Sequence, residues 1–251
     1  MKKHFLIFLM LAWAAFSGVP AFSQDESFAA DTKAAGQLQK ALKTNDRLAV
    51  ARLITYPLTR DAPLKPIANA KEFLAHWDEY FDAAATAELV AAQPEQYGWR
   101  GIALANGTVW FGKGHIVTIN TETAAAKKTL QDAKTGEASR LYPSLRGYDS
   151  IAFECSSKAM HIRVQKTGEE LHYFAWKKGA ALSSKPELEL AGGVYDPQGT
   201  GGNFNLTFQN NGYTYELEVG HNLCGEDCND YLTVTQSDKS VSHDICTEIK
   251  N

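Results

Sequence analysis

The sequence lacks the short motifs that identify many enzyme families. Its 251 residues contain no G-x-S-x-G nucleophile elbow, no H-E-x-x-H zinc motif, no Walker phosphate loop and no G-x-G-x-x-G dinucleotide fingerprint. These absences exclude the enzymes that depend on those signatures, and no cofactor is expected. A catalytic site assembled from distant residues leaves no such motif, so an enzyme stays an alternative.

Basic residues are fewer than acidic ones. The formal charge is −4, from 25 Lys and Arg against 29 Asp and Glu. Removal of Lys2 and Lys3 with the leader described below leaves 23 basic residues and a charge of −6. A chain with this charge is not expected to bind nucleic acid or anionic membrane surfaces.

Long apolar runs are absent outside the N-terminus. Residues 1–23 have the form of a signal peptide, with two lysines, an apolar run over 5–16 and the small residues of Ala21-Phe22-Ser23 before a cut at Gln24. A membrane anchor is the alternative, but the run is shorter than the roughly 18 residues that a span requires. No cysteine near the cut offers lipid attachment. The mature protein is therefore expected to be periplasmic or secreted, without membrane insertion.

Cysteine is scarce, and all four copies lie in the second half: Cys155, Cys224, Cys228 and Cys246. In an exported chain such cysteines tend to form disulfides, and four of them allow three connectivities. We favour Cys155 with Cys246, which lie in the first and last strand-like segments, and Cys224 with Cys228, which bracket a short loop. A lone C-x3-C spacing is a poor zinc signature, so no metal site is expected.

Helical spacing dominates residues 31–92. Asp31, Asp46 and Asn69 are expected to cap three successive helices, the last of them with Glu72 in a capping box. Behind that box, large apolar side chains recur at three- and four-residue spacing. Phe73, Leu74, Trp77 and Tyr80 form this series.

Strand spacing follows after residue 94. We expect strands over 99–104, 108–111 and 115–119, the first two joined by an Asn106-Gly107 hairpin turn. Helices followed by strands predict an α+β arrangement rather than alternating α/β.

Residues 121–144 are rich in Ala, Lys and Thr and form a connector, with a helix expected over 124–133. Beyond it the polarity alternates, which predicts about eight short strands, each with one face in water. On the strand from Met160, for example, His161, Arg163 and Gln165 are assigned to the wet face, and His172 is also expected at the surface. The expected strands lie at 151–155, 160–165, 171–176, 187–190, 204–209, 213–219, 231–235 and 241–246.

The sequence thus predicts an α+β domain over 25–121, a linker over 122–146 and an all-β domain over 147–251. Many short antiparallel strands separated by turns are typical of a barrel or a sandwich. Both alternatives remain open for the second domain.

The N-terminal half resembles the NTF2-like, or SnoaL-like, α+β cone superfamily. The resemblance covers about residues 30–120 and implies three to four helices on a curved antiparallel sheet, with a ligand pocket between them. The pocket candidates are His76, Tyr80, Arg100 and Trp110. The residues that carry the resemblance are Leu53 to Leu58, Asn69 to Leu74, His76-Trp77-Asp78, and the strand pair around Gly101, Gly107, Val109 and Trp110.

The helical spacing also predicts which of these side chains can act together. His76 and Asp78 lie on nearly opposite sides of one helix, so they are not expected to act as an acid-base pair. The plainer interpretation places Phe73 and Trp77 in the core and leaves His76 partly exposed.

The C-terminal half looks like the partner domain found behind such a cone in uncharacterised exported bacterial proteins. In plan it is also weakly similar to periplasmic C-type lysozyme inhibitors, which have cysteines in an early and a late strand, but it lacks their Ser-Gly-x-x-Tyr loop. A glycine-rich turn precedes the strand from Phe204. A structural turn is favoured there, with ligand contact as the alternative, and its loop candidates are Asp196, Gly199, Gly201, Gly202 and Asn203.

Taken together, these features favour an exported, non-enzymatic binding protein of the bacterial cell envelope, with an envelope protein or a small ligand as its partner. One alternative is an inhibitor of a cell-wall hydrolase such as lysozyme, because an acidic surface would steer encounter with a basic enzyme. The other alternative is a small-molecule enzyme that uses the N-terminal pocket. A turbidity assay of lysozyme activity tests the inhibitor alternative. The geometry of the N-terminal pocket tests the enzyme alternative.

Overall fold

The computed structural model describes residues 24–120, 122–199, 202–220 and 229–249. The predicted signal peptide, Gly201 and the predicted Cys224–Cys228 disulfide lie outside these ranges. Within the described residues, no helix has the length and apolarity needed to cross a membrane.

Helices come first along the chain, and a small sheet follows them. The four strands pair antiparallel in sequence order. The helices are α1 (Gln24–Lys43), α2 (Arg47–Leu53), α3 (Ala70–Ala75), α4 (Trp77–Tyr80) and α5 (Ala83–Ala91), and the strands are β1 (Glu95–Gln96), β2 (Ile102–Leu104), β3 (Val109–Gly112) and β4 (His115–Ile119). The hairpin at Asn106-Gly107 is confirmed, because both residues have positive φ and join β2 to β3.

Two of the three predicted helix caps are confirmed. Asp46 accepts a hydrogen bond from the amide of Ala49, and Asn69 accepts one from the amide of Glu72. Asp31 does not cap a helix; it lies inside α1 and is almost fully buried. Its Oδ1 accepts a hydrogen bond from Gly114 at 2.6 Å, so a tertiary contact with the β3–β4 turn satisfies this carboxylate.

The predicted third helix is divided at His76. This residue leaves helical geometry, with φ −105° and ψ 17°, and separates α3 from α4. The apolar face continues across the division, because Phe73, Trp77 and Tyr80 are all buried and the ring of Phe73 contacts the rings of the other two. The sequence pattern therefore predicted the buried face correctly but not the break.

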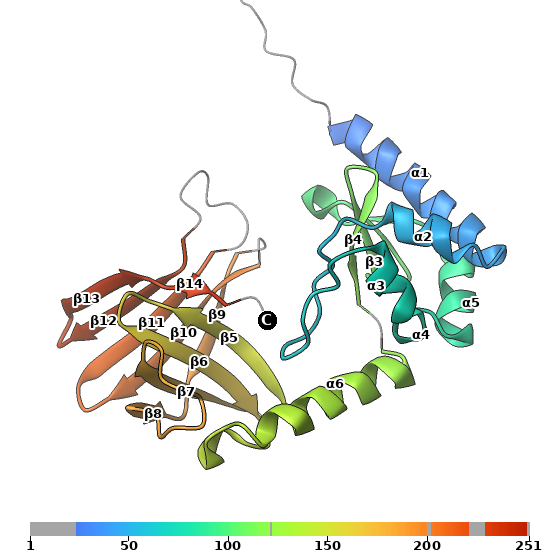
Figure 1. Ribbon diagram of the computed structural model, residues 1–251. Coiled ribbons are helices and arrows are strands. Elements are labelled where there is room, and N and C mark those ends of the chain that lie inside the picture. Colours follow the sequence, from blue (N-terminus) through green and yellow to red (C-terminus); the bar gives the residue numbers. More distant parts are fainter. Residues whose placement is uncertain (1–23, 121, 200–201, 221–228, 250–251) are drawn as a thin grey trace, which may run out of the picture.

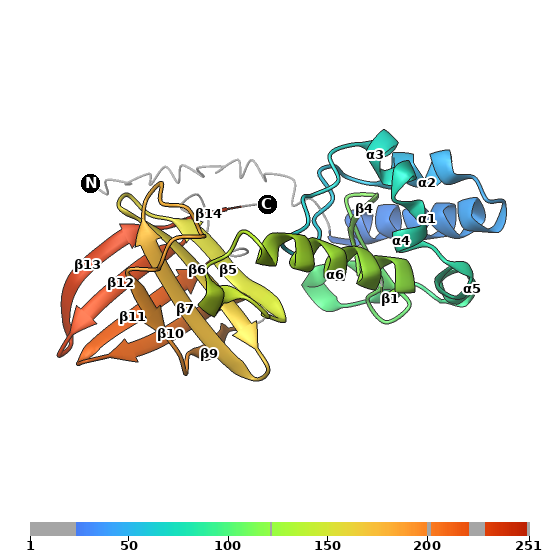
Figure 2. The same ribbon diagram turned by 60° about the horizontal axis from the view of Figure 1, so that its bottom comes forward.

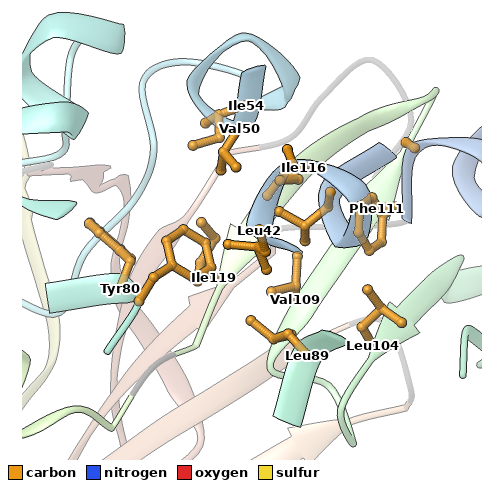
Figure 3. Close-up of a cluster of buried hydrophobic side chains, with 14 of the residues drawn as sticks. Leu42, Val50, Ile54, Tyr80, Leu89, Leu104, Val109, Phe111, Ile116 and Ile119 are labelled. Atoms are coloured by element: carbon orange, nitrogen blue, oxygen red, sulfur yellow. The ribbon is translucent and has the colours of Figure 1, made fainter. Parts of the chain in front are cut away.

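Buried side chains fill the space between these helices and the sheet (Figure 3). Leu42 from α1 and Leu89 from α5 lie next to Val109 from β3. Fully buried aliphatic and aromatic groups each contribute roughly 1.5–3 kcal/mol by removal from water. These side chains form the hydrophobic core of the first half.

The second half begins with a helix and continues as strands. Helix α6 covers Ala124–Ala138, longer than the predicted 124–133, with Thr123 as its cap. The strands are β5 (Ser150–Ser156), β6 (Met160–Thr167), β7 (Glu170–Lys177), β8 (Leu188–Leu190), β9 (Val194–Gln198), β10 (Asn203–Asn210), β11 (Tyr213–Val219), β12 (Tyr231–Gln236), β13 (Lys239–Ile245) and β14 (Thr247–Glu248).

These strands form two five-stranded antiparallel sheets, in the orders β13-β12-β11-β10-β9 and β14-β5-β6-β7-β8. They face each other across one buried cluster, in which Tyr173 of β7 packs against Phe208 of β10. Helices together with antiparallel sheets confirm the α+β class. None of the described sheets closes on itself, so the barrel alternative is wrong. Beyond the expected eight strands lie β9 and β14, which the pattern missed because β9 is exposed throughout and β14 is very short.

The predicted disulfide between Cys155 and Cys246 is confirmed. Cys155 belongs to β5, and Cys246 lies between β13 of one sheet and β14 of the other. The bond therefore fastens the chain where it crosses between the two sheets. A disulfide of this kind is compatible with an exported protein.

The prediction that His161, Arg163 and Gln165 of β6 face water is wrong. Arg163 and Gln165 are buried, with relative exposures of 0% and 1%, and the ring of His161 contacts Glu154 at 2.7 Å. A second cluster that includes Leu145 and Trp176 covers this side of the sheet. The alternation of polar and apolar residues correctly predicted that β6 has two different faces. It could not show that α6 and the residues that follow it, such as Leu145, cover the polar face.

Arg163 is the central polar group under that cover. Its Nη1 and Nη2 donate to the two carboxylate oxygens of Glu137 on α6, each at 2.8 Å, and Tyr148 donates to the same carboxylate. Burial opposes the charge of Glu137, but the hydrogen bonds from Arg163 and Tyr148 outweigh it and lower its pKa. Figures 1 and 2 show α6 running from the N-terminal helices to the sheet of β5–β7.

We expect Glu137→Gln to lower the free energy of unfolding by about 3 kcal/mol, because it leaves the charge of buried Arg163 undercompensated. Asp132→Asn on the same helix is the control, since its ion pair with Lys128 is exposed and worth less than about 1 kcal/mol. Urea denaturation measures both. Equal losses would contradict the assigned role of Arg163.

We expect Trp77→Ala to cost roughly 3–5 kcal/mol, the usual range for truncation of a buried Trp. His76→Ala should cost about 1 kcal/mol, because it loses one hydrogen bond from a side chain that is 33% exposed. Thermal unfolding of the two variants compares these losses, and similar midpoint shifts would overturn the assigned facing.

Candidate functional site

A cleft of about 930 Å³ lies where α6 meets the N-terminal helices. Its walls come from the loop before α3, from α4, from the end of β4 and from the first turns of α6. The lining residues are Thr59, Arg60, Asp61, Leu64, Glu79, Tyr80, Thr118, Ile119, Asn120, Glu122, Ala126, Lys127 and Leu130. We call this feature the Glu79 cleft.

Glu79 joins three separate segments of the chain. Its Oε1 lies 2.7 Å from Nδ1 of His76 and accepts a hydrogen bond from Thr129 of α6 at 3.1 Å. Its Oε2 accepts a hydrogen bond from Arg60. With both oxygens engaged and a guanidinium beside it, this carboxylate is satisfied and its charge is balanced.

Thr123 fixes the start of α6 against α4. Its hydroxyl accepts a hydrogen bond from the amide of Ala126 at 3.0 Å and donates to the carbonyl of Glu79 at 2.8 Å. A capping side chain satisfies one of the free amides at a helix start. The same group here also sets the position of the α6 wall of the cleft.

Tyr80 is the unusual polar group of the cleft. Its side chain is buried, with a relative exposure of 5%, and its hydroxyl has no hydrogen-bond partner among the described residues. Burial raises the pKa of Tyr80 to about 12, while the nearby charge of Arg60 acts in the opposite direction. The phenol is therefore neutral at physiological pH and carries a proton that it can donate. A buried donor without a partner is costly, which makes this position informative.

Charged groups surround the opening. Lys127 pairs with Glu122 at 3.1 Å, and both side chains are exposed. Asp61 is also exposed, and it has no ion-pair partner among the residues that the structure describes. In the described ranges no three His, Cys, Asp or Glu residues gather closely enough to hold a metal ion.

The structure separates the four pocket candidates into two places. Tyr80 lines the Glu79 cleft, whereas His76 does not line it but contacts the lining residue Glu79. Arg100 lies elsewhere, in an exposed position with its guanidinium 6.0 Å from the ring of Trp99. Trp110 of β3 packs beside Tyr97, with ring centroids 5.1 Å apart.

The glycine-rich loop candidates connect β9 to β10. Gly199 and Gly202 have φ values of 68° and 84°, which suit glycine and agree with a turn. Asp196 accepts a hydrogen bond from Gln198 at 2.7 Å within β9, and Asn203 begins β10. No bond from these candidates reaches the Glu79 cleft in the described contacts.

Sequence reasoning missed Arg60, Glu79, Thr123 and Thr129. One local signal existed, because Glu79 follows His76 by three residues, a spacing that brings side chains together on a helix. The other contacts join positions 19, 44 and 50 residues apart along the chain, and no pattern in a single sequence encodes such a meeting.

In comparisons with known proteins, no family model, curated protein or solved structure matches this chain. The resemblances to the NTF2-like superfamily and to the lysozyme inhibitors therefore stay predictions. A functional assignment rests on the geometry of the Glu79 cleft.

The raised pKa of Tyr80 predicts a stability loss in alkali. The unfolded phenol loses its proton near pH 10, whereas the folded one keeps it to about pH 12, so the stability should fall between these values by about 1.4 kcal/mol per pH unit. Tyr80→Phe should remove this component. Unfolding of both proteins by urea from pH 9 to 11.5 isolates it as a difference, and parallel pH profiles would contradict the assignment.

Proposed function

We propose that this chain is an exported binding protein that holds a small polar ligand in the Glu79 cleft. The observation that carries the proposal is the hydroxyl of Tyr80, a buried donor that lacks a partner within the described residues and belongs to a residue lining the cleft. A ligand oxygen that accepts this proton would remove the cost of leaving it unpaired. The cleft volume also falls in the range of known ligand sites, about 300–1,000 Å³.

Binding fits the polar groups better than catalysis does. A general base needs a free lone pair directed at its substrate. Glu79 instead accepts hydrogen bonds at both oxygens, and His76, whose Nδ1 contacts Glu79, is not among the residues that line the cleft. These contacts support a preformed binding surface.

Helix α6 would give the cleft a rigid wall. Its first turns contact α4 through Thr123 and Thr129, and its last turn is held to β6 by Glu137 and Arg163. Preorganisation of this kind reduces the entropy cost of binding. Because α6 is held at both ends, the shape of the cleft is fixed, which supports selective binding of a ligand with a complementary shape.

The two predicted domains and the family of the first one remain part of the proposal. The order of helices followed by an antiparallel sheet supports an NTF2-like domain over 25–121. Separate hydrophobic clusters support a second domain over 147–251. In this interpretation α6 is an ordered connector, and the ligand site lies beside the core of the first domain rather than within it.

The proposed function is tested by a substitution that fills the cleft with a larger side chain. Ala126 lines it from α6, so Ala126→Trp should block ligand entry. After incubation with a low-molecular-weight extract of bacterial cell envelopes, native mass spectrometry should detect a bound mass on the wild-type protein and at least a tenfold lower occupancy on this variant.

Ala124→Trp is the matched control, because Ala124 lies on the same helix but is exposed and does not line the cleft. It should keep the bound mass. Thermal midpoints verify that both variants fold. A bound mass that survives Ala126→Trp, or no bound mass on the folded wild type, would count against the proposed function.

A further inference from the structure

We propose that the ligand of the Glu79 cleft is a small amino sugar, a ring compound with hydroxyl groups and one primary ammonium group. This inference rests on the function proposed above and assigns the chemical class of the ligand. Three properties of the cleft lead to it. Tyr80 supplies a neutral donor, the carboxylate of Asp61 has no ion-pair partner among the described residues, and the lining combines apolar with polar side chains.

The deep part of the cleft favours a neutral oxygen. Arg60 and Glu79 compensate each other, and Thr129 and His76 complete the bonding of Glu79. The hydroxyl of Tyr80 is the donor left without a partner among the described residues. A ligand hydroxyl or ring oxygen can accept this proton without adding charge to a partly dry site.

The opening favours a positive charge. Arg60 pairs with Glu79 and Lys127 with Glu122, which leaves Asp61 as the unbalanced charge of the lining. The lining therefore carries one net negative charge. An ammonium group beside Asp61 would balance it, whereas an anionic ligand would be repelled.

The walls between these ends combine apolar and polar surface. Leu64, Ile119 and Leu130 offer apolar contact, and the hydroxyl of Thr59 and the amide oxygen of Asn120 offer hydrogen bonds. The amide nitrogen of Asn120 donates to the carbonyl of Gly107 at 3.0 Å, which holds this side chain in place. A sugar ring presents C–H groups on its faces and hydroxyl groups at its edge. An aliphatic amine without hydroxyl groups would leave the polar side chains of the lining without partners. A polyol without an amine would leave the charge of Asp61 unbalanced.

Three sugars that share one pyranose ring test the inference. Glucosamine, glucose and glucuronate differ in carrying a positive, a zero and a negative charge. Isothermal titration at low ionic strength, at a pH where the amine is protonated, should give glucosamine an affinity about tenfold above that of glucose. Glucuronate should bind more weakly than glucose.

Two variants assign the contacts. Asp61→Asn should abolish the preference for glucosamine over glucose, and Tyr80→Phe should weaken both sugars by a similar factor of roughly five to ten. Asp132→Asn removes an exposed carboxylate of α6 outside the cleft lining, and it should change neither affinity.

The outcomes separate the ligand class from the proposed function. Equal affinities for the three sugars, a preference for glucuronate, or no binding of any of them would overturn the amino-sugar assignment. The bound mass that depends on position 126 is measured independently, so it would still support a binding protein for another ligand. A glucosamine preference that persists in Asp61→Asn would also overturn the assignment.

Discussion

The burial of Arg163 constrains the second half of the molecule and, through α6, the first. A guanidinium with no exposed surface requires carboxylate partners, because a charge removed from water without them is costly. Glu154 supplies one partner from the neighbouring strand, at 3.5 Å, and Glu137 supplies the bidentate partner from α6. Once these bonds form, the last turn of α6 has a defined position on β6. The helix then extends from that point to α4, where Thr123 and Thr129 hold its other end.

This arrangement makes the Glu79 cleft a consequence of packing between segments that are distant in sequence. The carboxylate of Glu79 receives bonds from α6 and from the loop that carries Arg60, and the same carboxylate contacts His76. The satisfied groups position the walls, while among the described residues the Tyr80 hydroxyl has no hydrogen-bond partner and Asp61 has no ion-pair partner; in the proposed site these two groups would contact the ligand. Such a division between supporting and binding groups is typical of preorganised sites.

Several elements were predictable because their signals are local. The caps at Asp46 and Asn69 and the turn at Asn106-Gly107 depend on neighbouring residues, and each formed as expected. The disulfide of Cys155 with Cys246 followed from their places in an early and a late strand. Asp31 was predicted to cap a helix, but α1 begins earlier, at Gln24, and the buried carboxylate of Asp31 instead accepts a hydrogen bond from Gly114. Arg163 was assigned to a face in water, but α6 covers that face. Of the four pocket candidates, Tyr80 is the one that lines the Glu79 cleft; the position of this cleft depends on contacts with Arg60, Thr123 and Thr129, which no local pattern indicates.

The sequence by itself therefore determined the order of helices and strands, the apolar faces of most of them and the α+β class, because periodicity and capping act over a few residues. The tertiary structure decided that the two C-terminal sheets remain open and face each other, that α6 covers the polar side of β6, and that the cleft lies at the N-terminal end of that helix. Those outcomes depend on contacts between residues such as Arg60 and Glu79, or Glu137 and Arg163, which lie 19 and 26 positions apart. Their pairing is selected by burial and charge balance in the folded chain, and neither quantity exists until the elements have packed.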